Sequence, residues 1–320
     1  MNLRRRDLIA AVALPFSASA QERPRRVGVL SGLTEQDPAT VARLAAFRAG
    51  MEAAGWHEGR NLTIDTRYAP NTPEIARRLV DELLALKPDI LVVQGPAVAA
   101  AQKATSTVPI VMVVLPDPVG AKIVSSLAHP GGNITGFTST EPSFGAKWIE
   151  LLHEVKPDLK RVLVFWHNDT TMYQSNFADA GRHFAVEVVQ KHVETPDEIE
   201  PTITAFASHP DGGLVLPTDA FTAINRKAII ELSLRHKLPL VTGNPPFPED
   251  GGLMFYGADI IDIYRRAAVY VDRILKGAAP GELPVQQPTT LQLVINLKTA
   301  AAMGLKVPPS LRVRADQVIE

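Results

Sequence analysis

The first half of the chain alternates strand-length apolar runs with stretches of helical period. The apolar runs and one alternating stretch predict strands at 26–30, 62–68, 90–93, 110–114 and 134–137. Apolar residues between them recur at spacings of three and four, as on one helix face; in the first stretch they are Val41, Leu44, Phe47, Met51 and Ala54. Strands separated by helices predict βαβ units, and therefore a parallel sheet with right-handed crossovers.

The same alternation returns in the second half of the chain. It begins with a helix predicted at 144–155, and strands are predicted at 162–166, 186–193, 213–216, 238–241, 253–256 and 291–296. One strongly amphipathic helix has an apolar face made of Ile260, Tyr264, Ala267, Val271 and Ile274. This helix is expected to end at Gly277, because glycine commonly ends helices. A short helix is expected at 297–303.

About ten strands exceed the usual size of one compact doubly wound sheet. The pattern therefore predicts an α/β fold of two doubly wound parallel-sheet lobes joined by hinge crossovers. The chain is expected to cross between the lobes near 139–144, and again near Gly257, where the following helix can return to the first lobe. The predicted division is 21–139 with about 258–285 for lobe 1, and 140–257 with about 286–320 for lobe 2.

The composition narrows the function classes. Hydrophobic residues make up 46% and charged residues 21% of the 320 positions, as in ordinary globular proteins. A formal net charge of −1 gives no overall attraction to nucleic acid or to anionic membranes. The chain has no cysteine, which excludes disulfides, thiol nucleophiles and cysteine-ligated zinc.

The N-terminal 20 residues have the layout of a secretory signal. Arg4, Arg5 and Arg6 precede an apolar stretch at 8–16 that is too short to span a bilayer, and a cleavage-like Ala-Ser-Ala follows at 18–20. The pair of arginines before an apolar stretch resembles the core of a twin-arginine signal. Residues 1–20 are therefore expected to be a signal peptide and the mature protein to be periplasmic; the alternative is a basic helix kept in the mature chain.

Ligands of parallel α/β sheets bind at the loops that follow the carboxyl ends of the strands. In lobe 1 this rule selects Ser31, Gly32, Gln94, Gly95, Ala97, Asp117, Ser139 and Thr140. In lobe 2 it selects Trp166, Asn168, Thr218, Asp219, Phe221, Asn244 and Tyr256. The rule places Trp56 and His57 at the opposite end of the sheet, where they are interpreted as structural.

Motifs for catalysis, cofactors and metals are missing from the sequence. It contains no G-x-S-x-G, no G-x-x-x-x-G-K-[ST] and no G-x-G-x-x-G, and its histidines lack metal-ligand spacing. Asp117 and Asp219 fit three interpretations: a general acid and base, partners of a ligand ammonium group, or helix-capping and turn residues. We expect no catalytic residue, no cofactor and no metal.

Four segments carry a resemblance to a known family, and it covers nearly all of the mature region. They are 55–69 (GWHEGRNLTIDTRYA), 86–113, 117–137 (DPVGAKIVSSLAHPGGNITGF) and 251–320. The chain resembles the ABC-transporter substrate-binding family whose better-known members bind tryptophan or related amino acids. The resemblance implies a type I periplasmic-binding fold, in which two lobes close on a ligand between them.

Two departures from the family's pattern fall in the expected cleft. A Gly-Thr pair is common after the third strand, whereas this chain has Gly95-Pro96, which removes a hydroxyl and one backbone donor. Pro96 fits the first position of a helix, where its missing N–H costs nothing structurally. After the first strand of the second lobe the chain has Trp-His-Asn-Asp at 166–169, where tryptophan or asparagine with proline is usual. The family's role therefore carries over better than any particular ligand.

The expected function is that of the solute-binding component of an ABC importer, a monomer that partners the permease subunits and contacts the membrane only through them. Its ligand is expected to be a small polar, amino-acid-like or aromatic solute. A ligand carboxylate is expected on the amides near 31–32 and 94–97, an ammonium group on Asp117 or Asp219, and an apolar group against Trp166, Phe221 or Tyr256. The alternatives are a ligand-sensing module that delivers its closed form to a partner receptor, and an enzyme.

Overall fold

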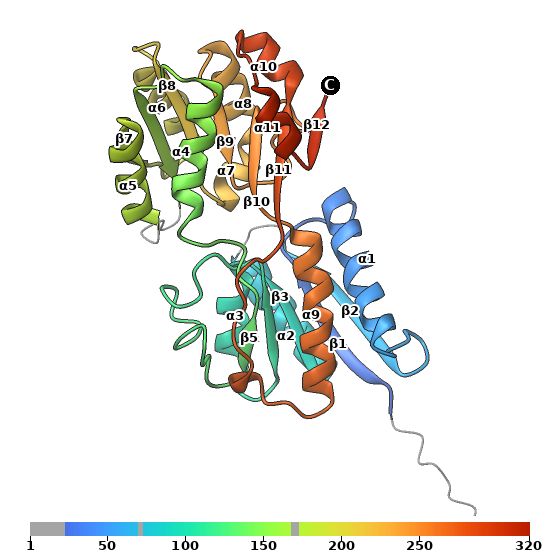
Figure 1. Ribbon diagram of the computed structural model, residues 1–320. Coiled ribbons are helices and arrows are strands. Elements are labelled where there is room, and N and C mark those ends of the chain that lie inside the picture. Colours follow the sequence, from blue (N-terminus) through green and yellow to red (C-terminus); the bar gives the residue numbers. More distant parts are fainter. Residues whose placement is uncertain (1–22, 70–72, 168–172) are drawn as a thin grey trace, which may run out of the picture.

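The computed structural model describes residues 23–69, 73–167 and 173–320. These residues form a mixed α/β fold with two lobes, one above the other in Figure 1. The signal peptide expected at 1–20 and the site residue Asn168 lie outside the described residues. The expectation of two sheets is confirmed, with five strands in one sheet and seven in the other among the described residues.

The sheet of lobe 1 is parallel throughout, in the order β2-β1-β3-β4-β5. Its strands are β1 (Arg25–Ser31), β2 (Leu62–Tyr68), β3 (Ile90–Gln94), β4 (Ile110–Val113) and β5 (Ile134–Gly136). The helices between them are α1 (Pro38–Ala53), α2 (Pro73–Ala85) and α3 (Ala97–Ala104). Residues of α2 and α3 cover one face of the sheet, and α1 covers the other.

The sheet of lobe 2 is mixed, in the order β12-β11-β10-β9-β8-β6-β7. Its strands are β6 (Arg161–Trp166), β7 (Glu187–His192), β8 (Gly212–Leu216), β9 (Leu240–Thr242), β10 (Met254–Ala258), β11 (Leu291–Asn296) and β12 (Gln317–Ile319). Among the described strands, β10 and β11 form the only antiparallel pair; β12 lies parallel to β11, and all other neighbours are parallel. This differs from the purely parallel sheet expected, because β10 runs toward lobe 1 while β11 comes back from it.

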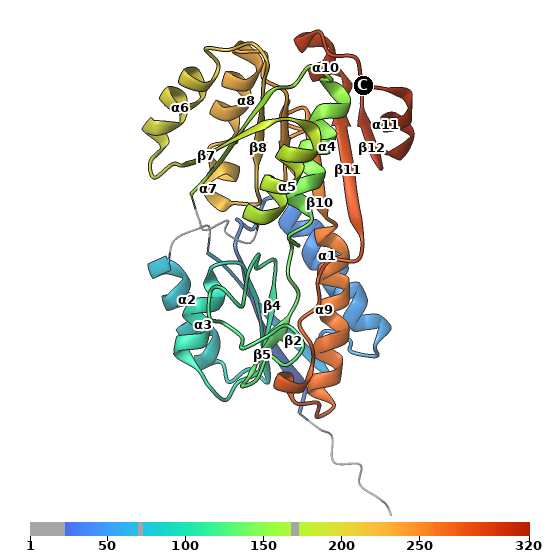
Figure 2. The ribbon, with the colours of Figure 1, turned by 60° about the vertical axis from the view of Figure 1, so that its left-hand side comes forward.

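Helices cover both faces of the second sheet, as Figure 2 shows. They are α4 (Phe144–Val155), α5 (Gln174–Phe184), α6 (Ile199–Phe206), α7 (Ala220–Ile224), α8 (Arg226–Arg235), α10 (Leu297–Met303) and α11 (Pro309–Arg314). Residues of α4, α5, α10 and α11 contribute to the core on one face, and residues of α6 and α8 to the core on the other. The sequence pattern predicted neither α11 nor β12.

The chain passes three times between the two lobes (Figure 1). It crosses after β5 into α4, again after β10 into α9 (Ile260–Leu275), and finally on the way to β11. A short 3₁₀ turn, η3 (Pro280–Glu282), precedes the last crossing; in lobe 2 a second one, η2 (Pro196–Glu198), precedes α6. The last crossing is tied down where Tyr270 donates a hydrogen bond to the Pro284 carbonyl at 2.6 Å.

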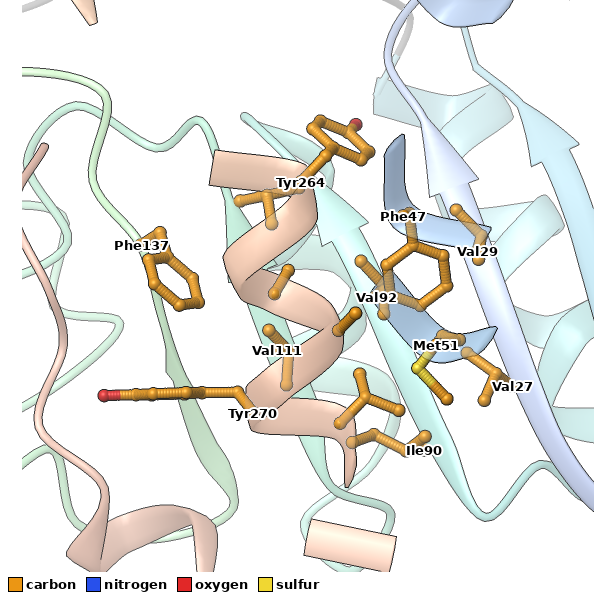
Figure 3. Packing of buried hydrophobic residues seen from close by; sticks show 14 of the residues in the cluster. Val27, Val29, Phe47, Met51, Ile90, Val92, Val111, Phe137, Tyr264 and Tyr270 are labelled. Atoms are coloured by element: carbon orange, nitrogen blue, oxygen red, sulfur yellow. The ribbon is translucent and has the colours of Figure 1, made fainter. Parts of the chain in front are cut away.

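Helix α9 completes the core of lobe 1 although it follows a strand of the other sheet. Figure 3 shows it packed on strands β1, β3 and β4 beside Phe47 and Met51 of α1.

The buried face of α1 differs from the one that the periodic pattern predicted. Val41 is 58% exposed, whereas Thr40 and Arg43 are buried with the predicted Leu44, Phe47 and Met51. Contact with α9 rotates the buried face of α1 away from Val41.

Candidate functional site

The carboxyl ends of both sheets face the junction between the lobes (Figure 1). Strands β1, β3 and β4 of lobe 1 end there, and so do β6, β8 and β9 of lobe 2. The loops after these strands carry most of the residues that the sequence selected.

Gln94 joins three segments of lobe 1 at the end of β3. Its Oε1 atom accepts the Gly32 backbone N–H at 3.2 Å and the Tyr264 hydroxyl at 2.8 Å. Ser31 is buried at the end of β1, and its hydroxyl accepts the N–H of Leu33. Burial raises the pKa of Tyr264 to about 12, while the nearby Arg43 opposes this shift. The loop after β1, the end of β3 and α9 thus form one rigid wall.

The start of α3 offers few free amides. Gly95, in the left-handed region at φ +58°, donates its N–H to the Val113 carbonyl, and Val98 donates back to Gly95. Pro96 has no N–H and occupies the N-cap, one position before the first helical position that the sequence predicted. The helix begins at Ala97, which is buried at 8% exposure. In the described chain, Ala97 alone of these residues has an amide without a backbone acceptor, so this turn is a weak anion site.

Asp117 closes a turn after β4. Its Oδ1 atom accepts the Gly120 N–H at 2.8 Å, and its backbone carbonyl accepts the N–H of Ala121. The turn interpretation of Asp117 therefore describes its local contacts. Asp117 follows β4, one of the strands that end at the junction, and the charge of its carboxylate adds to the rise that burial causes in the pKa of Tyr173.

Asp219 is buried at the end of β8 and caps helix α7. Its Oδ1 atom accepts the N–H groups of Phe221 at 2.7 Å and Thr222 at 3.2 Å. Its Oδ2 atom accepts the His167 N–H at 3.2 Å, which ties the end of β6 to the end of β8. Of the three interpretations, helix capping accounts for these local contacts.

Asn244 and Thr218 extend this polar network across the end of β9. Asn244 is 5% exposed; its Nδ2 donates to the Thr222 hydroxyl at 3.1 Å, and its Oδ1 accepts the Asp219 N–H at 3.3 Å. The Thr218 hydroxyl donates to the Gly243 carbonyl at 3.0 Å. Hydrogen bonds within lobe 2 therefore hold these side chains in place before any ligand is present.

The three aromatic candidates lie in two different environments. Phe221 stacks on His167 with ring centroids 4.7 Å apart and 17° between the planes, next to the Asp219 cap. Trp166, at the end of β6, is partly buried against the core. Tyr256 packs edge-on against Phe144 of α4 at 5.6 Å, and burial raises the pKa of its hydroxyl. Only Phe221 therefore shares a contact network with the polar candidates of lobe 2.

Several buried polar groups at the junction have no hydrogen-bond partner. Among the described residues, the hydroxyls of Ser139 on the first crossing and Thr40 on α1 lack one. Tyr173, 2% exposed, lies close to Thr140 but makes no hydrogen bond of normal geometry, and burial raises its pKa. Thr140 itself donates to the Pro116 carbonyl at 3.1 Å. Buried polar groups are nearly always paired in native proteins, so the hydroxyls of Ser139 and Thr40 are open to a partner from water or from a ligand, as are the buried oxygens of Thr66 and Asp211 elsewhere in the described fold.

The strand-end rule did not select Thr40, Arg43, Tyr173 or Tyr264. Thr40, Arg43 and Tyr264 lie on helices, and Tyr173 immediately precedes one. Arg43 is the most unusual of them, since its side chain is buried at 8% exposure and burial lowers the pKa of its guanidinium. Only the i, i+4 spacing of Arg43 and Phe47 hinted that Arg43 shares the buried face.

Other features of the described residues carry no competing site. A hollow between α6 and α8 is lined by Glu200, Thr204, Glu231 and Arg235, away from the strand ends. Arg235 pairs across it with Glu200 of α6 at 2.7 Å and along its own helix with Glu231 at 2.8 Å. Among all the described residues, no three metal-ligating side chains come together. No helix in residues 23–69, 73–167 and 173–320 is long and apolar enough to cross a membrane.

The comparisons with known proteins agree on the family. The family model described as ABC transporter substrate binding protein matches residues 27–319. The tyrosine-binding protein of Clostridioides difficile strain R20291 is 26% identical over 289 residues, which cover 89% of this chain and 82% of that protein. A conserved domain protein from Vibrio cholerae has a solved structure with a TM-score of 0.82 and 27% identity, covering 92% of this chain and 100% of that one.

A second solved structure supports the fold alone. The ABC domain from Streptococcus pneumonia in complex with L-Trp has a TM-score of 0.81 and 24% identity, and the match covers 92% of this chain and 100% of that one. Because the family model spans nearly all of the described residues and these relatives share the two-lobed fold, the chain belongs to the ABC transporter substrate binding protein family.

Proposed function

We propose that this protein is the extracytoplasmic solute-binding component of an ABC importer, and that it binds an aromatic or related amino acid between its two lobes. Membership of the family supports the transport role. The relative named for tyrosine binding, which matches most of both chains, supports the ligand class. The twin-arginine signal expected at 1–20 accounts for export, and the permease subunits are the expected partners.

The observation that carries the proposal is the set of buried polar groups at the junction. The hydroxyls of Ser139 and Thr40 have no partner among the described residues. Leaving a buried donor or acceptor unpaired costs about 1–3 kcal/mol each. A polar solute held between the lobes would satisfy these groups, and an enzyme is not needed to explain them.

Binding is proposed to favour a closed arrangement of the lobes. The three crossings are the places where the chain can bend, since the two cores contain separate clusters of residues. A ligand shifts the population of the closed form only by as much as it binds that form more tightly. Contacts made by both lobes at once supply this difference. The proposed monomer then presents its closed form to the permease, or, in the alternative role, to a sensory receptor.

A thermal-shift screen of the purified protein tests the proposal. We expect L-tyrosine, L-tryptophan or L-phenylalanine to raise the melting temperature, because a ligand that binds only the native state stabilises it by mass action. The same amino acids without their α-carboxylate, such as tyramine, are the matched controls. No shift with any of the twenty L-amino acids would refute the proposed ligand class, and no shift across sugars, nucleosides and carboxylates as well would refute solute binding.

A further inference from the structure

Arg43 is a buried cation with no counter-ion in contact. Its side chain is 8% exposed on the face of α1 that packs into lobe 1. No carboxylate of the described chain lies within 4.0 Å of its guanidinium, and this guanidinium makes no hydrogen bond to any described residue. Arginines that are this strongly buried are normally paired, because burying an isolated charge is costly.

The surroundings of Arg43 place it at the carboxyl end of the lobe 1 sheet. It lies one helical turn before Phe47, and the charge of its guanidinium acts on Tyr264. Figure 3 shows Tyr264 at the end of α9 where the strands β1 and β3 finish. The Tyr264 hydroxyl in turn reaches the Gln94 side chain at 2.8 Å. Arg43 is therefore next to the wall that Gln94 forms.

The carboxylate that acts on Arg43 is that of Asp37, and it is already engaged. Its Oδ1 atom accepts the Ala39 N–H at 2.8 Å as the N-cap of α1, and it lies beyond ion-pair distance of Arg43. Thr40, one turn before Arg43 on the same face, has a buried hydroxyl without a partner. Arg43 and Thr40 thus lie on the same face of α1. The guanidinium has no hydrogen bond or ion pair to a described residue, and the hydroxyl of Thr40 is fully buried without a partner.

A guanidinium has five N–H donors in a planar fork that matches a carboxylate, and it stays charged at neutral pH. A buried charge without a partner is costly, so an anion that paired with Arg43 on binding would remove this cost. The amides at the start of α3 are less suited to this role. Pro96 has no N–H and those of Gly95 and Val98 already bond to backbone carbonyls, so Ala97 alone among them offers an amide.

We propose that Arg43 is the lobe 1 anchor for the carboxylate of the bound solute, with the Thr40 hydroxyl beside it. This inference rests on the proposed function and sharpens it, since it restricts the ligand to solutes that carry a carboxylate. Sugars, nucleosides and free amines leave the guanidinium unpaired and are excluded. The anchor replaces the helix N-terminus at 94–97 as the position of the ligand carboxylate.

The first test uses the protein without ligand. Arg43→Met removes the charge and keeps most of the volume, and we expect a melting temperature equal to or above that of the wild type. Arg48→Met is the matched control, because Arg48 lies on the same helix, is exposed and pairs with Glu58. If Arg43→Met melts several degrees below both the wild type and Arg48→Met, Arg43 stabilises the free protein, and the proposed anchor is overturned.

A double-mutant cycle with Asp37→Asn tests the internal alternative. Asparagine is as good an N-cap as aspartate, so this change removes the charge and keeps the cap. We expect the effects of Arg43→Met and Asp37→Asn on the melting temperature of the free protein to add. A strong coupling between them would identify Asp37 as the partner of Arg43 and would overturn the proposal.

The second test measures binding of L-tyrosine and of L-tyrosinamide, which lacks the carboxylate charge, by isothermal titration calorimetry. We expect the wild type to bind the acid at least about tenfold more tightly than the amide, as a charge-assisted hydrogen bond implies. Arg43→Met should bind both equally, Arg43→Lys should keep part of the preference, and Arg48→Met should behave as the wild type. A preference in Arg43→Met equal to that of the wild type would overturn the anchor.

Failure of the proposed function gives a different result. If the wild type binds none of the twenty L-amino acids, the amino-acid class is wrong, and Arg43 is then tested with carboxylates that lack an amine. 4-Hydroxyphenylacetate, benzoate and citrate, each with its amide, are the probes. A carboxylate that stabilises the wild type and not Arg43→Met supports the anchor. Absence of any such Arg43-dependent shift overturns it.

Discussion

At the scale of single residues, Asp219 combines a structural duty with a position at the candidate site. It lies at the end of β8, and its two oxygens accept N–H groups from Phe221, Thr222 and His167. Its carboxylate also carries a negative charge at the carboxyl end of the sheet, which a ligand ammonium group can pair with. Stability and ligand binding can therefore be separated by choosing the substitution.

Replacing Asp219 should destabilise the protein in a graded way. Asp219→Ala removes the cap of α7 and the bond to His167, and we expect a loss of about 2 kcal/mol in the free energy of unfolding. Asp219→Asn can keep the oxygen that caps α7 but turns an N–H toward the His167 amide, so the expected loss is about 1 kcal/mol. Urea denaturation measures both, and equal stability of Ala, Asn and wild-type proteins would contradict the capping role.

The asparagine variant also reports on the ligand. If Asp219 binds an ammonium group, Asp219→Asn should weaken an amino acid while leaving the affinity for the corresponding acid without its amine unchanged. Asp259→Asn, at the N-cap of α9, is the control for the loss of a helix-capping carboxylate. Equal affinity of wild type and Asp219→Asn for the amino acid would remove this charge from the site.

Sequence reasoning finds residues at strand ends and misses those on helix faces. The strand-end rule placed Gln94, Asp219 and Asn244 correctly at the carboxyl ends of β3, β8 and β9, because topology alone decides this edge. The sequence did not predict Arg43 as a site residue, because an arginine in a helix normally lies in solvent. The rotation of α1 that buries Arg43 depends on contact with α9. That contact joins residues far apart in the chain, which no local pattern encodes.

At the scale of elements, the packing of α1 on α9 depends on one glycine. A Cβ atom built at Gly50 would lie 2.7 Å from the Ala268 Cβ and 2.9 Å from the Arg265 carbonyl oxygen. Both contacts are shorter than the van der Waals radii of the atoms allow, and the Arg265 oxygen belongs to the backbone, which cannot move aside easily. The glycine therefore allows the two helix axes to approach closely.

Gly50→Ala should therefore destabilise the protein, although alanine is the better helix former. Helix propensity alone would add about 1 kcal/mol, whereas overpacking a close helix contact costs about 1–3 kcal/mol. We expect a net loss of up to about 2 kcal/mol in the free energy of unfolding, measured by urea denaturation. The control Ala49→Gly, at the exposed neighbouring position, should also lose about 1 kcal/mol. A gain in stability for Gly50→Ala would show that α9 moves away freely.

The periodic pattern predicted most elements and missed those that depend on their neighbours. It gave the 144–155 helix its observed bounds, because a continuous apolar face marks that helix. The antiparallel direction of β11 was missed, since direction follows from which lobe the chain comes back from. Strand β12 has three residues, too few for an alternation to stand out.

At the scale of the whole molecule, the three crossings join two lobes that have separate cores. The anchor proposed on lobe 1 and the polar network of Asp219 and Asn244 on lobe 2 can act on one solute only if the lobes approach each other. The hydrogen bond of Tyr264 to Gln94 in lobe 1 and that of Asp219 to Asn244 in lobe 2 each stay within one lobe, so closure is expected to move each lobe as a unit.

Spin labels on the two lobes test this closure directly, because the chain has no native cysteine to compete for the label. Val41 on α1 and Ile224 on α7 are 58% and 62% exposed, so cysteine at both positions should leave the fold intact. We expect L-tyrosine, or the amino acid with the largest thermal shift, to shorten and narrow the distance distribution measured by pulsed electron paramagnetic resonance. The pair Val41→Cys and Val269→Cys, on α1 and α9 of the same lobe, should not change. A ligand that raises the melting temperature but leaves the inter-lobe distance unchanged would show binding without closure, and the population shift proposed for delivery to the permease would then be wrong.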